Sequence, residues 1–362
     1  MTTHIHKPGD QLIGRYEIRS YIAEGGMQQV YLAADHALNR QVALKVPKTE
    51  SAIKRFARSA IVSAKVVHPN VAATLDYFEV DSRSYLIEEL ISGTPLSIRL
   101  ASEFLYLDPH LAAHVIHHIA KGVAASHHVG VFHRDLKPSN IMVSSDPALT
   151  AIKITDFGIA KMAEEELAEA FRDEESTTGS QTAMGALPYM APEMIRDQKS
   201  AGLPADIWAV GAILYQFISG NLPFGRGLGA TPRILEATLP PMPALFLTSP
   251  QFKPLTEDLW SIVSLCMRKE PAERPEADQL VKLCAKLCYS DAVRRTGTIA
   301  TWKYSSWGFI AADDGEEVFF HGENYYASER PKLGARVNFA DFPGSPRNRA
   351  FPVIPLRTVE AN

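Results

Sequence analysis

The stretch Val131-Phe-His-Arg-Asp-Leu-Lys-Pro-Ser-Asn140, followed shortly by Asp156-Phe-Gly158, decides how the rest of the chain is interpreted. Within ten residues it carries a carboxylate, an ammonium group and an amide, and a second carboxylate follows on a turn that ends in glycine. These groups suit phosphoryl transfer, which needs alignment and charge neutralisation more than covalent chemistry. Asp135 can accept a hydroxyl proton, and Lys137 can contact the phosphate that is being transferred.

Asn140 and Asp156 provide the oxygen ligands that Mg2+ prefers in proteins. The ordered run resembles the catalytic loop and the metal-binding motif of the eukaryotic-like (Hanks-type) Ser/Thr protein kinases of bacteria. A single Asp or Lys would more often be a helix cap or a solvated surface residue, so the ordered set is what indicates the family. The resemblance implies an α+β bilobal protein kinase fold, with ATP and Mg2+ as cofactors and Asp135, Lys137, Asn140 and Lys45 as catalytic residues.

The length of 362 residues predicts two or three domains. The formal net charge of −4 gives no overall basic field toward nucleic acid or membrane. There is no run of about 18 apolar residues and no secretory signal, so we expect a cytoplasmic protein without a membrane span. Cys266, Cys284 and Cys288 lack a second Cys/His pair, which favours reduced core thiols over zinc ligands.

Residues 1–11 are expected to form a flexible start, and short alternating segments predict the β-strands of a small lobe over residues 12–92. The run from Ala23 to Val30 aligns with the glycine-rich loop of the family and keeps only the second of its three glycines, as Gly25. Lys45 matches the lysine that binds the α/β-phosphates. The resemblance assigns ATP binding to a set of residues from both lobes: Ile22, Gly25, Gly26, Val30, Ala43, Lys45, Glu88, Glu89, Ile91, Met142 and Asp156.

The helix expected after Lys45 lacks the acid that the family uses. In the family a helix glutamate pairs with the lysine, but here that position is Ser59, and residues 51–67 contain no acid. Glu88 stands at the gatekeeper position beside the adenine pocket, where the family usually has an apolar residue, and a buried carboxylate needs a partner. Two interpretations stay open: Lys45 has lost its partner and the domain is weakly active, or Glu88 replaces the missing glutamate.

The large lobe is expected over residues 93–290, with an activation segment that runs from Asp156 to Glu193. Its acid-rich middle, from Met162 to Glu175, is most simply a solvated charged helix. Arg134 could pair with a phosphate that is added further along the segment and so order it. The resemblance places candidate phosphorylation sites on a run of hydroxyls: Ser176, Thr177, Thr178, Ser180 and Thr182.

Other positions of the large lobe match scaffold residues of the family. Asp206 matches the aspartate that binds the backbone of the catalytic loop, and Glu193 and Arg274 match a buried ion pair. Ala186 stands where Ser/Thr kinases usually carry a threonine, whose hydroxyl touches the catalytic Asp and Lys. The positioning of the substrate is therefore in question.

Composition changes near the end of the chain, where residues 291–362 contain 11 of the 32 aromatic residues. Short alternating segments separated by Gly, Asp and Pro predict a small all-β barrel over residues 296–357. The segments Gly297–Trp302, Ser306–Ile310, Asp313–Gly315 and Val318–His321 resemble, in order, the OB-type barrel of the cold-shock domain. In that family, aromatic side chains on one face stack on single-stranded bases. The matching positions are Trp302, Trp307, Phe309, Phe319 and His321.

Half of these aromatic residues must instead form the barrel core. Residues 291–362 also carry nine basic and nine acidic residues, so binding of RNA or DNA would rest on stacking rather than on charge.

The sequence thus predicts ATP- and Mg2+-dependent phosphorylation of protein Ser/Thr hydroxyls, including the protein's own, combined with a barrel for single-stranded RNA or DNA. The alternative is a nucleotide-binding pseudokinase scaffold, which Ser59, Ala186 and the reduced glycine loop favour. The complete chemical set of Lys45, Asp135, Asn140 and Asp156 favours the enzyme. The protein substrate is unknown, and a homodimer is left open.

Overall fold

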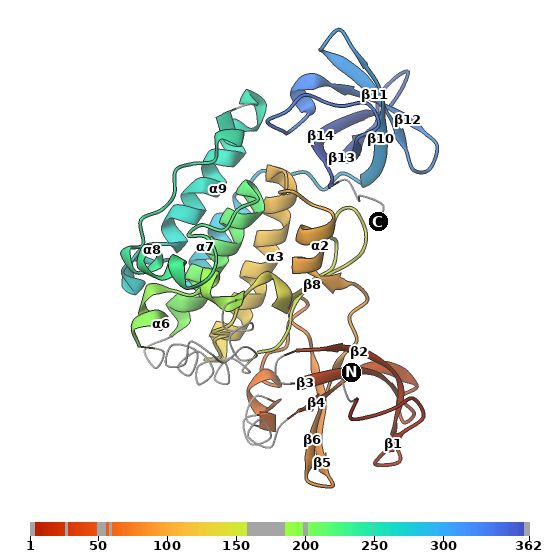
Figure 1. Ribbon diagram of the computed structural model, residues 1–362, viewed down its shortest axis with the longest axis vertical. Coiled ribbons are helices and arrows are strands. Elements are labelled where there is room, and N and C mark those ends of the chain that lie inside the picture. Colours follow the sequence, from red (N-terminus) through yellow and green to blue (C-terminus); the bar gives the residue numbers. More distant parts are fainter. Residues whose placement is uncertain are drawn as a thin grey trace.

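The computed structural model describes residues 4–25, 28–48, 56–57, 60–157, 185–197, 202–247 and 249–357. Three parts follow one another along these residues: a small lobe built on a sheet, a helical large lobe, and a barrel. The small lobe and the barrel lie at opposite ends of the large lobe (Figure 1). None of the described helices is long and apolar enough to cross a membrane.

The small lobe is a six-stranded antiparallel sheet with the order β1-β2-β3-β4-β6-β5. One face of the sheet is closed by a cluster of buried residues that includes Tyr16, Tyr31 and Leu44. Strand β3 alternates buried with half-buried residues, as expected for a strand with one covered face. The strands are β1 (Gln11–Leu12), β2 (Tyr16–Glu24), β3 (Gln28–Asp35), β4 (Arg40–Pro47), β5 (Thr74–Val80) and β6 (Arg83–Glu89).

The segment from His4 to Asp10 lies against this sheet. The backbone N–H of Ile5 donates to Gln29 Oε1 at 2.9 Å, and His6 Nε2 lies 3.1 Å from the Tyr85 hydroxyl. The sequence predicted a flexible start for residues 1–11, whereas the described part of that start forms specific contacts with β3 and β6.

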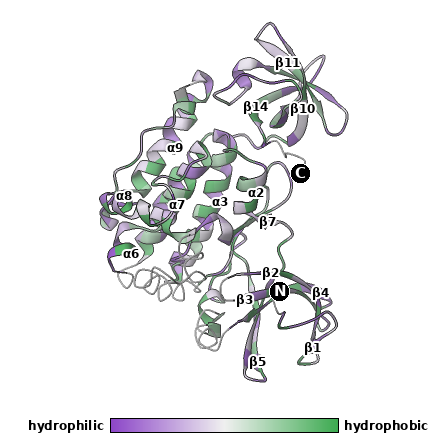
Figure 2. Cartoon of the chain, in the orientation of Figure 1, coloured by the Kyte–Doolittle hydropathy of each residue, from purple (hydrophilic) through white to green (hydrophobic). Residues whose placement is uncertain are grey.

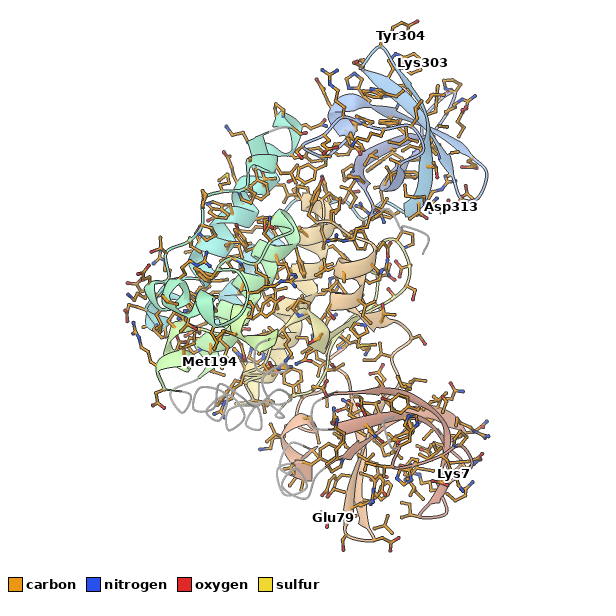
Figure 3. The ribbon with its side chains drawn as sticks, in the orientation of Figure 1. Lys7, Glu79, Met194, Lys303, Tyr304 and Asp313 are labelled. Atoms are coloured by element: carbon orange, nitrogen blue, oxygen red, sulfur yellow. The ribbon has the colours of Figure 1, made fainter. Side chains whose placement is uncertain are left out.

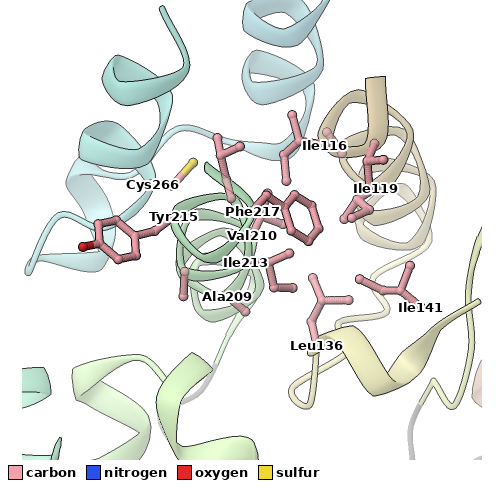
Figure 4. Close-up of a cluster of buried hydrophobic side chains, with 14 of the residues drawn as sticks. Ile116, Ile119, Leu136, Ile141, Ala209, Val210, Ile213, Tyr215, Phe217 and Cys266 are labelled. Carbon is pink, nitrogen blue, oxygen red and sulfur yellow. The ribbon is translucent and has the colours of Figure 1, made fainter. Parts of the chain in front are cut away.

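The large lobe is built around two long helices, α3 and α7. The Asp108 side chain caps α3 by accepting from the N–H groups of His110 and Leu111, and α7 ends at Gly220, which has a left-handed φ of 71°. Side chains of both helices meet those of the catalytic region in one cluster (Figure 4). Much of α7 is hydrophobic, because it is surrounded by the rest of the lobe (Figure 2).

The α-helices in the described part of the large lobe are α2 (Leu96–Ser102), α3 (Pro109–His128), α6 (Pro192–Arg196), α7 (Leu203–Ser219), α8 (Thr231–Glu236), α9 (Lys253–Cys266) and α10 (Ala277–Ala285). Its small sheet has the order β7-β8-β9, with β7 (Thr94–Pro95), β8 (Ile141–Val143) and β9 (Ile152–Ile154). Within the described residues, the short 3-10 helices are η1 (Pro138–Asn140), η2 (Leu187–Tyr189), η4 (Leu228–Ala230), η5 (Ala244–Leu247), η6 (Pro250–Phe252), η7 (Pro271–Glu273) and η8 (Gly322–Asn324).

The last part is a closed five-stranded barrel with the order β10-β11-β12-β14-β13. Strands β12 and β14 run parallel, and the other neighbours are antiparallel. The small barrel predicted from the sequence is therefore present, while its OB-type, cold-shock identity stays a prediction. Its strands are β10 (Arg294–Lys303), β11 (Trp307–Ala312), β12 (Glu317–His321), β13 (Arg336–Phe342) and β14 (Arg349–Pro355).

The barrel and the large lobe share a core. Tyr326 and Ile354 of the barrel belong to the main hydrophobic cluster of the large lobe, and Phe351 stacks on Phe252 with ring centroids 5.3 Å apart. The Arg294 guanidinium contacts the buried Asp108 carboxylate at 2.5 Å, and Asn338 Nδ2 donates to the Pro147 carbonyl at 2.9 Å. These contacts hold the barrel in a fixed position on the large lobe.

Candidate active site and barrel surface

A buried ion cluster lies between the two lobes. Lys45 Nζ lies 2.5 Å from Glu88 Oε2 and 2.8 Å from Asp156 Oδ1. Strands β4 and β6 pair Lys45 with Leu86 and Ala43 with Glu88, so Lys45 and Glu88 are diagonal neighbours on one face of the sheet. The two side chains are only 7% and 6% exposed. The contact is therefore set by the register of two central strands.

Burial and charge act against each other in this cluster. Burial disfavours the ammonium form of Lys45, but the charges of Asp156 and Glu88 raise its pKa above the ordinary value. Burial raises the pKa of Asp156 and the Lys45 charge lowers it, and the net direction is downward. Burial raises the pKa of Glu88 against the opposing effect of Lys45. One ammonium thus serves two carboxylates, of which Asp156 ionises more readily.

Gln28 also contacts the Asp156 carboxylate. Its Nε2 donates to Asp156 Oδ1 at 3.0 Å, the oxygen that also accepts from Lys45. Gln28 stands where the family has its third loop glycine, and no sequence signal indicated that its amide would reach this carboxylate. Asp156 itself has a left-handed backbone with a φ of 63°, an uncommon conformation for a residue other than glycine.

The catalytic loop brings three of the predicted residues together. Lys137 Nζ lies 2.8 Å from Asp135 Oδ2, and Asn140 Nδ2 donates to the backbone oxygen of Asp135 at 2.8 Å and to its Oδ2 at 3.1 Å. The amide oxygen of Asn140 is the group left for a cation. Asp135 Oδ1 is buried without a hydrogen-bond partner among the described residues. The hydrogen-bonding capacity of this oxygen is therefore unused in the present arrangement of the described residues.

Several buried groups hold this loop in place. The Asp206 carboxylate accepts from the N–H groups of His133 and Arg134 at 2.7 and 2.8 Å, as its match to the family implied. His133 Nε2 lies 2.8 Å from the Thr155 carbonyl, and the Thr155 N–H donates to the Asn140 carbonyl at 2.9 Å. His133 and Thr155 thus connect the two motifs quoted at the outset, and the sequence analysis did not single them out. Arg134 has a left-handed φ of 65° beside this network.

The predicted adenine-binding residues take their places at the lobe boundary. Ala43 is buried on β4, and Met142 on β8 is half-buried between Pro95 and Lys153. The Glu89 carboxylate accepts from Lys153 Nζ at 3.0 Å through Oε2. Among the other positions, Ile22 is exposed, and Val30 and Ile91 are half-buried. Gly25 donates its N–H to the Gln28 carbonyl at 2.9 Å.

Some predicted residues lie outside the described part of the chain. These are Gly26, Ser59 and the hydroxyls of the activation segment, namely Ser176, Thr177, Thr178, Ser180 and Thr182. Ala186 is described, is buried, and lines a small pocket together with Arg134 and Asp135. The scaffold pair also forms, with Arg274 Nη1 lying 2.6 Å from Glu193 Oε1.

Two lobes that meet at the cluster of Lys45, Glu88 and Asp156, with Asp135, Lys137 and Asn140 on the adjoining loop, have the arrangement of the protein kinase class. Residues 16–283 match the protein kinase domain, so the chain belongs to this family, and the predicted kinase resemblance is confirmed. The family match ends before the barrel, so the cold-shock resemblance stays a prediction.

The relatives include bacterial enzymes. The chain is 33% identical over 276 residues to the serine/threonine-protein kinase PknA of Mycobacterium tuberculosis, which covers 74% of this chain and 59% of that protein. It is 32% identical over 221 residues to the serine/threonine-protein kinase PrkC of Bacillus subtilis. This match covers 60% of this chain and 32% of PrkC. The crystal structure of Rad53 1–466 in complex with AMP-PNP shares the fold, with a TM-score of 0.55, 21% identity, and 74% and 64% of the two chains covered. The matched region spans between a third and three fifths of the two curated relatives.

On the barrel, strand register separates the predicted aromatic residues into two sets. Trp307 pairs with His321 and Phe309 pairs with Phe319, so these four share the outer face. Trp302 pairs with Gly308 and stacks on the buried Phe320 at 5.5 Å, which places it with the barrel core. A β-bulge between Ile299 and Thr301 shifts the alternation of β10 and explains the position of Trp302.

Cations accompany the outer rings. Lys303 Nζ lies 5.4 Å from the ring centroid of Trp307, and the Arg347 guanidinium lies 5.0 Å from that of Phe309. The ring centroids of Trp307 and Phe309 are 5.7 Å apart. Lys303 lies with Tyr304 at the tip of the barrel farthest from the large lobe (Figure 3). The outer face defined by Lys303, Trp307, Phe309, Phe319, His321 and Arg347 is called the aromatic face below.

Proposed function

We propose that this protein is a serine/threonine protein kinase, which transfers the γ-phosphoryl group of ATP to protein hydroxyls. One observation carries this proposal. A continuous series of ion pairs and hydrogen bonds connects Lys45 to Asp156, passes through Thr155 to Asn140, and ends at Asp135 and Lys137. It crosses from the small lobe to the large lobe and contains each chemical group that phosphoryl transfer requires.

The donor set fits Mg2+ and ATP. Asn140 and Asp156 would hold Mg2+, because their side-chain oxygens are of the type that this ion takes. Bound Mg-ATP supplies the phosphoryl group and neutralises charge that develops on it. Lys45 uses two of its three N–H donors on Glu88 and Asp156, which leaves one for a phosphate oxygen. Ile22, Val30, Ala43, Met142 and the backbone of Glu89 and Ile91 would enclose the adenine.

Asp135 would orient the acceptor hydroxyl and take its proton. Lys137, held by Asp135 Oδ2, would lie against the phosphoryl group as it moves. Incorporation of radiolabelled phosphate from Mg-ATP into a general protein substrate, compared between wild type and Asp135→Asn, tests this function. Nucleotide binding without incorporation that depends on Asp135 would favour the pseudokinase alternative.

Phosphorylation of the protein by itself belongs to the same proposal. Arg134, next to Asp135, offers a cation for a phosphate on Ser176, Thr177, Thr178, Ser180 or Thr182. Mass spectrometry of wild type incubated with Mg-ATP should find phosphate on this run, and the Asp135→Asn variant should lack it. Phosphate confined to other parts of the chain would contradict the switch.

A second function is favoured by the aromatic face of the barrel. These rings are half-buried and point outward, with Lys303 over the ring of Trp307 and Arg347 over that of Phe309. Such a face suits single-stranded RNA or DNA, whose bases stack on rings while phosphates meet cations. Titration of a fluorescent single-stranded oligonucleotide with the full chain tests it. Binding that is equally tight for a duplex of the same length would argue against stacking.

A further inference from the structure

We propose that Glu88 is the positioning residue of Lys45, so that strand β6 rather than a helix sets the place of the phosphate-binding lysine. Asp156 is then the exchangeable partner and Glu88 the permanent one. The inference deepens the proposed kinase function and rests on it.

The closest contact of the ion cluster joins Lys45 and Glu88. Lys45 and Glu88 lie 2.5 Å apart, and both side chains are almost completely buried. Within the described part of the chain, Lys45 is the hydrogen-bond partner of the Glu88 carboxylate. A buried carboxylate with a single cationic partner depends on that partner, because removing one member leaves an uncompensated charge.

The two carboxylates that contact Lys45 lie on differently held backbone: Glu88 on a strand, and Asp156 outside one. Strand β6 is paired on both sides, with Glu88 opposite Ala43 of β4 and opposite Thr74 of β5. Asp156 lies two residues beyond the end of β9 and has a left-handed backbone conformation. Gln28 donates to Asp156 Oδ1, the oxygen that also contacts Lys45. Asp156 is also a candidate Mg2+ ligand, so a bound cation would compete with Lys45 for its carboxylate, whereas the Glu88 carboxylate has no such second role.

Stability alone is a weak reason for an ion pair at this buried position. A buried ion pair generally stabilises a fold no better than a well-packed apolar pair of similar volume. Burial also raises the pKa of Glu88, which means that its ionised form is held against a cost. The Glu88 carboxylate contacts Lys45, the lysine that the phosphates need. Its function is therefore to hold the Lys45 ammonium in place.

Kinetics of Glu88→Gln, Glu88→Asp, Lys45→Gln and the double variant Lys45→Gln/Glu88→Gln test the proposal. Glu88→Gln should lower kcat about a hundredfold, as expected for loss of alignment, and should raise KM for ATP by a smaller factor. Glu88→Asp, which keeps the charge, should restore part of the rate. In the Lys45→Gln background, Glu88→Gln should have no further effect, because Glu88 acts through Lys45. An equal loss in both backgrounds would overturn the proposal.

Asp35→Asn is the matched control. It removes the charge of Asp35 from another ion pair of the same sheet, in which Arg15 Nε lies 2.8 Å from Asp35 Oδ1. The Asp35 side chain is fully buried, and that of Arg15 is 30% exposed. It should leave kcat unchanged, and an equal loss of kcat would show that sheet stability alone explains Glu88→Gln.

If wild type shows no transfer that depends on Asp135, the proposed function fails and the proposal for Glu88 is decided by calorimetry with Mg-AMP-PNP. The proposal is supported if Glu88→Gln lowers the affinity for Mg-AMP-PNP in the wild-type background but not in the Lys45→Gln background. Equal affinity of wild type and Glu88→Gln overturns it.

Discussion

Two buried ion pairs of almost the same geometry occur in this protein, one at the active site and one where the barrel meets the large lobe. Lys45–Glu88 and Arg294–Asp108 both have a nitrogen–oxygen distance of 2.5 Å, and no side chain in either pair is more than 7% exposed. Their surroundings differ. Arg294 Nε donates to the neutral Asn338, and Asp108 Oδ1 accepts two backbone N–H groups of α3. Lys45 instead faces a second carboxylate and keeps a donor for a ligand.

The difference shows how one interaction type can serve two purposes. Where neutral protein groups complete the hydrogen bonding of a buried pair, the pair joins two parts of the fold. Where an ammonium faces two carboxylates and one of them is exchangeable, the cluster is prepared for a charged ligand. The comparison therefore predicts that damage at the junction affects stability, and damage at Lys45–Glu88 affects catalysis.

Arg294→Met should have the largest effect, because it leaves Asp108 buried without its cation. We expect the free energy of unfolding to fall by about 3–5 kcal/mol, measured by urea denaturation of the full chain. Lys332→Met is the control, since Lys332 and Glu329 form a pair whose side chains are 75% and 72% exposed. It should cost less than about 1 kcal/mol. Equal losses for the two variants would remove the structural role assigned to the junction.

Glu88→Gln should show the opposite pattern. The rate should fall about a hundredfold, which corresponds to a loss of about 2.7 kcal/mol in transition-state stabilisation. The free energy of unfolding should not fall. Burial raises the pKa of Glu88, so the folded protein binds this proton more tightly than the unfolded chain does. The contribution of Glu88 to the free energy of unfolding therefore falls as pH rises from the ordinary carboxyl pKa to the folded-state value.

Gln cannot ionise, so urea unfolding of Glu88→Gln should lack that fall over the same pH range. A variant that is less stable than wild type above this range would place Lys45–Glu88 in the same structural class as the junction.

Trp307→Ala tests the aromatic face, where the cations Lys303 and Arg347 contact aromatic rings instead of carboxylates in a buried pair. Loss of one stacking ring should weaken binding of a single-stranded oligonucleotide by about 1–3 kcal/mol, measured by fluorescence anisotropy. The free energy of unfolding should change little, because Trp307 lies outside the barrel core. Leu333→Ala, at a residue 67% exposed and outside the aromatic face, is the control and should bind like wild type. If Trp307→Ala binds equally well, the face has another purpose.

Gln28→Ala should have the smallest effect and the opposite sign. It removes one donor to Asp156 Oδ1, so Mg-AMP-PNP should bind more tightly by about 0.5–1.5 kcal/mol in calorimetry. The gain would show that Asp156 is the exchangeable partner in the cluster. Weaker binding would indicate that Gln28 contacts the nucleotide instead.

The sequence by itself determined the kinase family and the catalytic loop. Asp135, Lys137 and Asn140 lie within six positions of one another, so a short turn is enough to bring them together, and their order is specific. The barrel could also be predicted, because alternation and turn residues are local signals.

The tertiary structure decided what depends on register and on long-range contact. A shift of one residue in a strand turns each side chain to the other face, so only the pairing of β4 with β6 places Glu88 on Lys45. In the same way, only the bulge in β10 turns Trp302 into the barrel core. Arg294 and Asp108 are 186 positions apart, and no local pattern connects them. Their contact exists because the barrel and the large lobe bury one common apolar surface, which brings the two charges together.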